Sequence, residues 1–137
     1  MSADDAFKWC TDYGENDFSL MGMKGSRQIE KVSDDVIILI DKIFKNEKFV
    51  VKKKLVRLDA KKLFWSNTHL AGPNKHSQFL YQINPVGQKS KLEFIGLQVN
   101  YSKTKPTSKE IISLQRKLKN DDSTIWKRLA KKMGEEL

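Results

Sequence analysis

Between residues 27 and 101 the chain consists of short segments in which apolar and polar residues alternate, separated by turn-forming residues. Alternation with a period of two is typical of β-strands that bury one face. The segments 27–32, 36–44, 49–58, 63–70, 76–83 and 91–101 are therefore expected to form about six strands. Their connections have the length of hairpin turns, which favours a single antiparallel sheet.

Helical patterns flank these strands on both sides. Ser2 is expected to cap a first helix that ends near Gly14, and a short helical turn is expected over 17–23. Thr107 and Glu110 resemble a capping box, so a helix is expected over 107–119. The polar run 120–122 interrupts the pattern, and a last helix is expected over 123–133. The predicted fold class is α+β, with the C-terminal helix lying across one face of the sheet.

Length and composition predict one globular domain over residues 1–137. The 137 residues are 39% hydrophobic and 31% charged, a balance typical of folded rather than disordered chains. The longest apolar run, "VIILI", is far shorter than the roughly 20 residues of a membrane span. The N-terminal segment has no secretory pattern, and the single Cys10 has no internal disulfide partner. A reducing, cytoplasmic location is expected.

The net charge of +9 permits attraction to nucleic acid or to anionic lipid. The lysines are spread over several segments, with the densest groups at 52–54, 61–62 and 127–132. The two C-terminal helices permit a helix-turn-helix interpretation. However, Asp121 and Asp122 lie where contacts with phosphate groups would be needed, and the last helix has a core-facing stripe. Nucleic-acid binding is kept as an alternative function.

Neither a metal nor a cofactor is expected. His69 and His76 are seven residues apart, and the spacings that provide three or four converging zinc ligands are absent from the sequence. No nucleophile motif is present, and Cys10 is expected to be a small core residue. A cyclase-like or hydrolase-like enzyme stays open as an alternative, with acid–base groups meeting in one cavity. The groups that suit this chemistry are His69, His76, Tyr81, Glu93 and Tyr101.

Taken in order, the segments resemble START-like proteins of the SRPBCC superfamily, the helix-grip group that includes Bet v 1 relatives and polyketide cyclases. The resemblance rests on "SADDAFKWCTDY", then "RQIEKVSDDVIILIDKI", "FVVKKKLVRLDAKKLFWSNTHLAGP" and "SQFLYQINPVGQKSKLEFIGLQV", and a late helix ending "WKRLAKKM". It covers nearly the whole chain. It implies a curved antiparallel sheet wrapped around the C-terminal helix, with an apolar cavity that binds a small hydrophobic or amphipathic molecule, lipid-like or polyketide-like. Binding or transport is preferred to catalysis.

The sequence departs from this family at its start. The family has a β-strand before the first helix, whereas here Met1 is followed at once by "SADDAF". Either the protein begins further upstream or the sheet lacks that strand. A missing strand leaves an edge with unpaired backbone groups, which proteins usually cover or pair. A homodimer that pairs these edges, or a C-terminal segment that covers the gap, is expected as the remedy.

The resemblance places ligand contacts on the strands and on the two terminal helices. Small-molecule cavities are mostly apolar with a few polar groups, so aromatic walls with a histidine near the mouth are expected. Phe94 lies on the opposite alternation from Leu97 and Val99, so at most one of these sets faces inward. The predicted ligand-binding residues are Phe7, Trp65, His69, His76, Phe79, Tyr81, Leu97, Val99, Ile125, Trp126 and Leu129.

Overall fold

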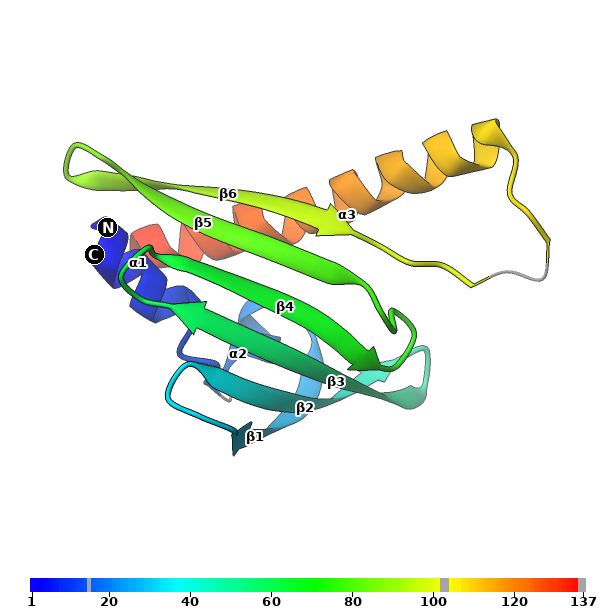
Figure 1. The fold of residues 1–137 in the computed structure, drawn as a ribbon, viewed down its shortest axis with the longest axis horizontal. Coiled ribbons are helices and arrows are strands. Elements are labelled where there is room, and N and C mark those ends of the chain that lie inside the picture. The colour runs from blue at the N-terminus through cyan, green and yellow to red at the C-terminus, as the bar shows by residue number, and fades with distance from the viewer. Residues whose placement is uncertain (15, 102–103, 136–137) are drawn as a thin grey trace.

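A computed structural model describes residues 1–14, 16–101 and 104–135 of the chain (Figure 1). Two short helices come first, α1 (Ala3–Cys10) and α2 (Asp17–Leu20), and a long helix, α3 (Ser108–Glu135), comes last. The strands between them are β1 (Lys24–Lys31), β2 (Val36–Lys45), β3 (Lys48–Asp59), β4 (Phe64–Ala71), β5 (Gln78–Val86) and β6 (Lys89–Leu97). The predicted α+β class, with a six-stranded antiparallel sheet and a C-terminal helix, is confirmed.

Each strand pairs in antiparallel fashion with the next along the chain, so the sheet order is β1-β2-β3-β4-β5-β6. The connection between β5 and β6 is shorter than the predicted strands 76–83 and 91–101 imply, because Pro85 pairs with Ser90 and Val86 pairs with Lys89. The pairing of β4 with β5 ends at Gln82, so Pro85 lies where a missing N–H costs no bond to β4. β6 also ends at Leu97, which leaves Val99 and Tyr101 outside the sheet.

The two helix caps that the sequence predicts are confirmed. The backbone N–H of Asp5 donates to the Ser2 hydroxyl (3.2 Å), and the backbone N–H of Glu110 donates to the Thr107 hydroxyl (3.2 Å). The predicted division of the C-terminal segment into two helices is wrong, because α3 runs unbroken from Ser108 to Glu135. The run 120–122 contains neither glycine nor proline, and asparagine or aspartate costs a helix only a few tenths of a kcal/mol. A helix-turn-helix is therefore absent from this segment.

The helices lie on one face of the sheet and leave the other face bare (Figure 1). α1 and the C-terminal half of α3 cover the side of β5 and β6, while α2 lies against β1. Arg128 ties α3 to α2, since its Nε donates to the Leu20 carbonyl (2.8 Å). The N-terminal half of α3 extends away from the sheet, and its Ile111, Ile112 and Leu114 are 42–50% exposed. The helix therefore closes the core from Leu118 onward, where its side chains pack against the buried cluster.

A buried ionic network joins β1, β2, β3 and α2 on the covered face. Arg27 of β1 donates to both carboxylate oxygens of Asp41, at 2.7 and 3.0 Å, and to Asp17 at 2.8 Å. Lys54 also contacts Asp41 at 2.9 Å. The Arg27 side chain is 4% exposed and that of Asp41 is 0% exposed. Charges removed from water in this way must keep their partners, because an unpaired one would be very costly.

Asp41→Asn tests this network, since it removes one charge and leaves Arg27 and Lys54 undercompensated in the core. We expect the free energy of unfolding to fall by about 3 kcal/mol, as for other broken buried pairs. Urea unfolding followed by circular dichroism measures the change. Asp34→Asn is the matched control, because it removes an exposed ion pair with Lys31 and should change stability little. Equal effects of the two substitutions would contradict a structural role for the Arg27–Asp41 pair.

Candidate functional site

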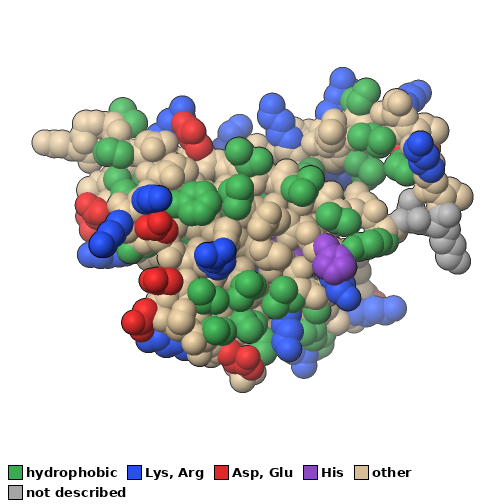
Figure 2. All heavy atoms as spheres, viewed as in Figure 1, with side chains coloured by type: hydrophobic (Ala, Val, Ile, Leu, Met, Phe, Trp, Pro, Cys, Tyr) green, Lys and Arg blue, Asp and Glu red, His purple; other side chains and the backbone are tan. Residues whose placement is uncertain are grey.

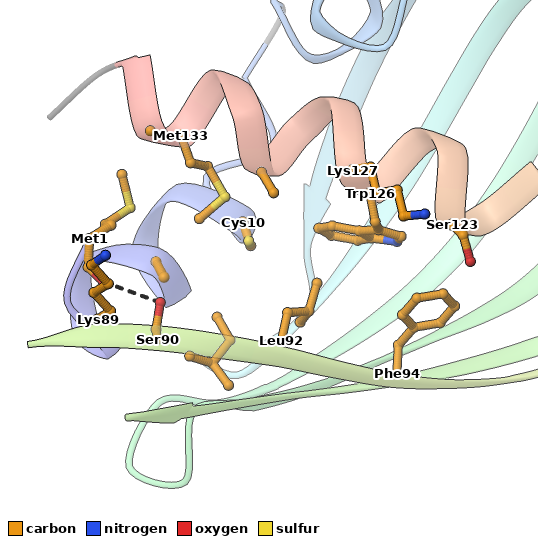
Figure 3. A pocket seen from close by; sticks show the side chains of 14 residues that line it. Met1, Cys10, Lys89, Ser90, Leu92, Phe94, Ser123, Trp126, Lys127 and Met133 are labelled. Carbon is orange, nitrogen blue, oxygen red and sulfur yellow. Dashed lines mark hydrogen bonds between the residues drawn. The ribbon is translucent and has the colours of Figure 1, made fainter. Parts of the chain in front are cut away.

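A groove of about 480 Å³ runs between the C-terminal half of α3, α1 and β6 (Figure 3). We call it the α3–β6 groove. It is open to solvent along one side, and most of its wall is apolar. Its lining residues are Met1, Ala6, Cys10, Ile83, Lys89, Ser90, Leu92, Phe94, Ser123, Trp126, Lys127, Ala130, Met133 and Gly134.

The groove exists because of a change in side-chain size along one face of α3. Trp126, Ala130 and Gly134 follow at intervals of four residues, so they lie one above the other on that face. The indole of Trp126 reaches the sheet, with its ring 5.4 Å from that of Tyr81 and 6.4 Å from that of Phe94. The next two turns present only a methyl group and a hydrogen atom. Trp126 therefore spans the distance between α3 and β6, whereas Ala130 and Gly134 are too small to span it, and the space beside them stays open.

The same pattern recurs on α1. Ala6 and Cys10 are four residues apart, and both line the groove with small side chains. Burial, and then the charges of Asp12 and Asp17, raise the pKa of the Cys10 thiol to about 12. The thiol is therefore neutral near pH 7 and forms part of the apolar wall. It is not a poised nucleophile, because nucleophilic cysteines need a lowered pKa.

The polar groups at the groove carry positive charge or are hydroxyls. Among the described lining residues the charged side chains are Lys89 and Lys127, and both lysines are exposed. Ser90 donates from its hydroxyl to the backbone carbonyl of Met1 (3.2 Å), which holds the start of the chain beside β6. The described residues of the lining include no Asp or Glu, so their charges favour an anion at the mouth of the groove.

A second hollow of about 430 Å³ adjoins the groove further along α3. It shares Phe94 and Ser123 with the α3–β6 groove, and it is also lined by Gly96, Gln115, Leu118, Lys119 and Asp122. Burial, and then the charge of Asp121, raise the pKa of the Asp122 carboxyl. This second hollow is the more polar of the two.

Of the residues considered from sequence for ligand binding, Trp126 lines the groove, and so does Phe94, on the strand face alternative to Leu97 and Val99. The others occupy different places. Trp65 and Tyr81 are buried and stacked on each other, with ring centroids 4.9 Å apart, so they fill space that the prediction assigned to a cavity. Phe7, Phe79 and Leu129 are buried as well. Leu97 is 64% exposed. Val99 and Ile125 are half-buried and line neither hollow.

The two histidines line neither hollow, and their side chains lie in different environments although their backbones are hydrogen-bonded to each other. His69 is 6% exposed, packs edge-on against Phe79, and has no hydrogen-bond partner for Nδ1 among the described residues. Burial, and then the nearby charges of Lys54 and Lys52, lower its pKa to about 4. His76 is exposed on the β4–β5 turn and contacts the Tyr101 hydroxyl. The two therefore do not form one polar contact at a cavity mouth.

The acid–base groups considered for an enzyme are likewise dispersed. Glu93 is exposed on β6 and pairs with Lys91 at 3.2 Å. Tyr81 is buried among aromatic rings, and burial followed by the charge of Asp122 raises its pKa. None of the five candidates lines either hollow. In the described part of the chain no cluster of three or more His, Cys, Asp or Glu residues is placed to hold a metal ion.

Sequence reasoning missed the residues that make the groove by being small. Ala6, Ala130 and Gly134 were not among the predicted contacts, nor were Leu92 and Met133, which form its wall. The signal was present as small residues at four-residue spacing on two helical faces. It becomes informative only once the helices are known to face the same strand.

No protein-family model, curated protein or solved structure matches the chain. Within the described residues, no helix has the length and apolar character needed to cross a membrane. The arrangement of residues in the groove is therefore the basis on which a function can be proposed.

The buried His69 predicts a specific pH dependence of stability. Its folded-state pKa of about 4 lies below the ordinary value of 6.5, so protons bind to the unfolded state first as the pH falls. Its contribution is present above pH 6.5 and is lost towards pH 4. In His69→Gln the fall in unfolding free energy between pH 7 and pH 5 should be smaller than in the parent by about 2 kcal/mol.

Urea unfolding at several pH values measures this difference. His76→Gln is the matched control, because it removes the exposed histidine and leaves His69 in place. An identical pH dependence in His69→Gln and the parent protein would contradict the burial of a neutral imidazole.

Proposed function

We propose that this chain is a START-like, helix-grip protein that binds a small hydrophobic or amphipathic molecule, lipid-like or polyketide-like, in the α3–β6 groove. The observation that carries the proposal is the groove itself, about 480 Å³ of mostly apolar space between a helix and the last strand. Its volume falls in the range of small-molecule sites, about 300–1,000 Å³. The helix-grip assignment is supported by six antiparallel strands with the C-terminal helix on one face.

The driving force would be removal of apolar ligand surface from water. Each buried methylene contributes about 0.8 kcal/mol, so an acyl chain that buries ten of them gains about 8 kcal/mol before ordering costs. Leu92, Phe94 and Trp126 provide flat or branched apolar surface on two sides of such a chain. Met133 adds a flexible side chain that can adapt to ligands of different shape.

The polar rim favours one end of an amphipathic ligand over the other. Lys89 and Lys127 place two ammonium groups near the mouth, and Ser90 and Ser123 add hydroxyls. A negatively charged head group would meet these donors while its chain lies along the wall. A positively charged head would be repelled by Lys89 and Lys127.

Binding is favoured over catalysis because the groove residues that the structure describes include no poised acid or base. Its titratable side chains are Cys10, whose pKa is raised to about 12, and the two exposed lysines. General acid–base catalysis works best with a group that titrates near the operating pH. The histidines considered for that role lie elsewhere, one buried and one on an exposed turn.

Ala130→Phe tests the proposal by filling the groove from α3. We expect the parent protein to bind anilinonaphthalene sulfonate with increased fluorescence, and hexadecanoate to displace the dye. In Ala130→Phe the affinity for hexadecanoate should fall by about tenfold or more, because the ring occupies space that the chain needs. Fluorescence titration measures both affinities.

Lys131→Phe is the matched control. It adds the same ring one residue further along α3, at an exposed position outside the groove lining. It should leave the affinity for hexadecanoate unchanged. Equal affinities in Ala130→Phe and the parent protein, or an absence of hexadecanoate binding to the parent, would contradict binding in this groove.

A further inference from the structure

The bare face of the sheet carries an exposed apolar cluster at the β2–β3 hairpin. Phe44 and Phe49 lie opposite each other on the two strands, with ring centroids 5.2 Å apart. They are 42% and 61% exposed, and the neighbouring Val51 is 51% exposed. Figure 2 shows hydrophobic side chains gathered on this face over β2 and β3, with basic side chains beside them. Large apolar groups in such an exposed cluster often mark an interaction surface.

The same hairpin carries a dense positive charge. Residues 42–54 contain six lysines and one acidic residue, Glu47. The hairpin thus holds a charge of +5 within 13 residues, more than half of the net +9 of the chain. Lys54 is paired with the buried Asp41. Lys42 and Lys53 are exposed and share the alternation of Phe44 and Phe49, and Lys45 and Lys48 are exposed on either side of the turn. The surface therefore combines exposed phenylalanines with the ammonium groups of Lys42 and Lys53 on the same face and those of Lys45 and Lys48 at the turn.

The hairpin is rigid enough to present these groups together. Asn46 and Glu47 form its two-residue turn, and both have positive φ angles, 52° and 62°. This is the geometry of the tight turns that match the twist of paired strands. The pairing of β2 with β3 continues from Lys45 and Lys48 at the turn to Val36 and Arg57. The aromatic pair is thus fixed at one end of a long, continuous ladder.

We propose that the β2–β3 hairpin is a docking surface for an anionic lipid bilayer. Phenylalanine rings at its tip would enter the boundary between head groups and acyl chains, and the surrounding lysines would attract the anionic head groups. This surface lies on the bare face of the sheet, whereas the α3–β6 groove lies on the covered face. The inference therefore does not depend on what the groove binds.

Two other occupants fit the hairpin less well. A second copy of the chain would bring one lysine-rich hairpin against another, and the like charges would repel. Single-stranded nucleic acid needs open aromatic faces on which bases stack. The face of Phe49 is covered by Lys42, whose Nζ lies 4.7 Å from the ring centroid, and the edge-on packing of Phe44 restricts it further.

The experiment compares sedimentation of the full chain with phosphatidylcholine vesicles that contain or lack phosphatidylserine. The parent protein should bind the vesicles with phosphatidylserine, bind those of phosphatidylcholine alone much more weakly, and lose affinity as salt rises. Phe44→Ser with Phe49→Ser should lower the affinity by about tenfold or more, because both interfacial rings are lost. Lys45→Gln with Lys48→Gln should weaken binding to anionic vesicles without changing the fold.

Ile95→Ser with Leu97→Ser is the matched control. It removes two apolar side chains that are more exposed than the phenylalanines, at 70% and 64%, from β6 on the same bare face. It should leave vesicle binding unchanged. Phe49→Ser alone, at the more exposed position, provides the readout if the double phenylalanine variant does not fold, as judged by circular dichroism.

Several results would overturn the proposal. One is equal binding of the parent protein to both kinds of vesicle, and another is unchanged binding in the hairpin variants. Light scattering that shows a dimer lost in Phe49→Ser would assign the hairpin to self-association. Binding of single-stranded oligonucleotides, but not of vesicles, with the same dependence on Phe49 would assign it to nucleic acid.

Discussion

The contact between Trp126 and the sheet sets the position of the C-terminal helix. The α3–β6 groove follows from that position. The indole meets Tyr81, Tyr81 stacks on Trp65, and Trp65 meets the ring of Phe7 at 5.7 Å. This aromatic series connects α3, β5, β4 and α1 through the core. Each contact adds a geometric preference to the burial of large apolar area. With α3 fixed at this point, the small residues that follow leave the groove open beside β6.

The two halves of the sheet are stabilised by different means. β4, β5 and β6 pack against α1 and α3 through aromatic and aliphatic side chains. β1, β2 and β3 are tied to α2 by the Arg27–Asp41 network, with the Arg27 guanidinium also lying over the rings of Tyr13 and Phe18. A buried ionic network contributes little net stability but strongly penalises rearrangement. The β2–β3 hairpin is thereby held in place while its outer face stays free of helices.

The order of elements could be predicted from sequence because it depends on local signals. Alternation placed the strands, and the hydroxyls of Ser2 and Thr107 marked the helix starts. Asp41 was also readable, since in "VIILIDKIF" it shares the alternation of Leu39 and Ile43 and so brings a charge to the buried face. The polar run 120–122 predicts a break between two helices, but asparagine and aspartate are compatible with a helix interior, and α3 continues through them.

The site could be predicted only in part, because alternation predicts the face of the sheet on which a side chain lies and not its tertiary contacts. Trp65 and Tyr81 are buried, as their alternation predicts, but their rings stack on each other instead of lining a cavity. Whether inward residues fill a space or line it depends on distances between elements remote in sequence. The groove follows from side chains that are small, at Ala130 and Gly134, and small residues give no hydrophobic signal of their own.

The most direct test of the central claim is to locate a bound acyl chain by NMR. A stearic acid with a nitroxide label on its chain broadens the signals of nearby methyl groups when it binds. If the chain lies between α3 and β6, the methyl signals of Leu92, Ala130 and Met133 will broaden, while that of Val51 on the bare face will stay sharp. Broadening confined to the bare face, or no broadening near α3, would contradict a ligand site in the α3–β6 groove.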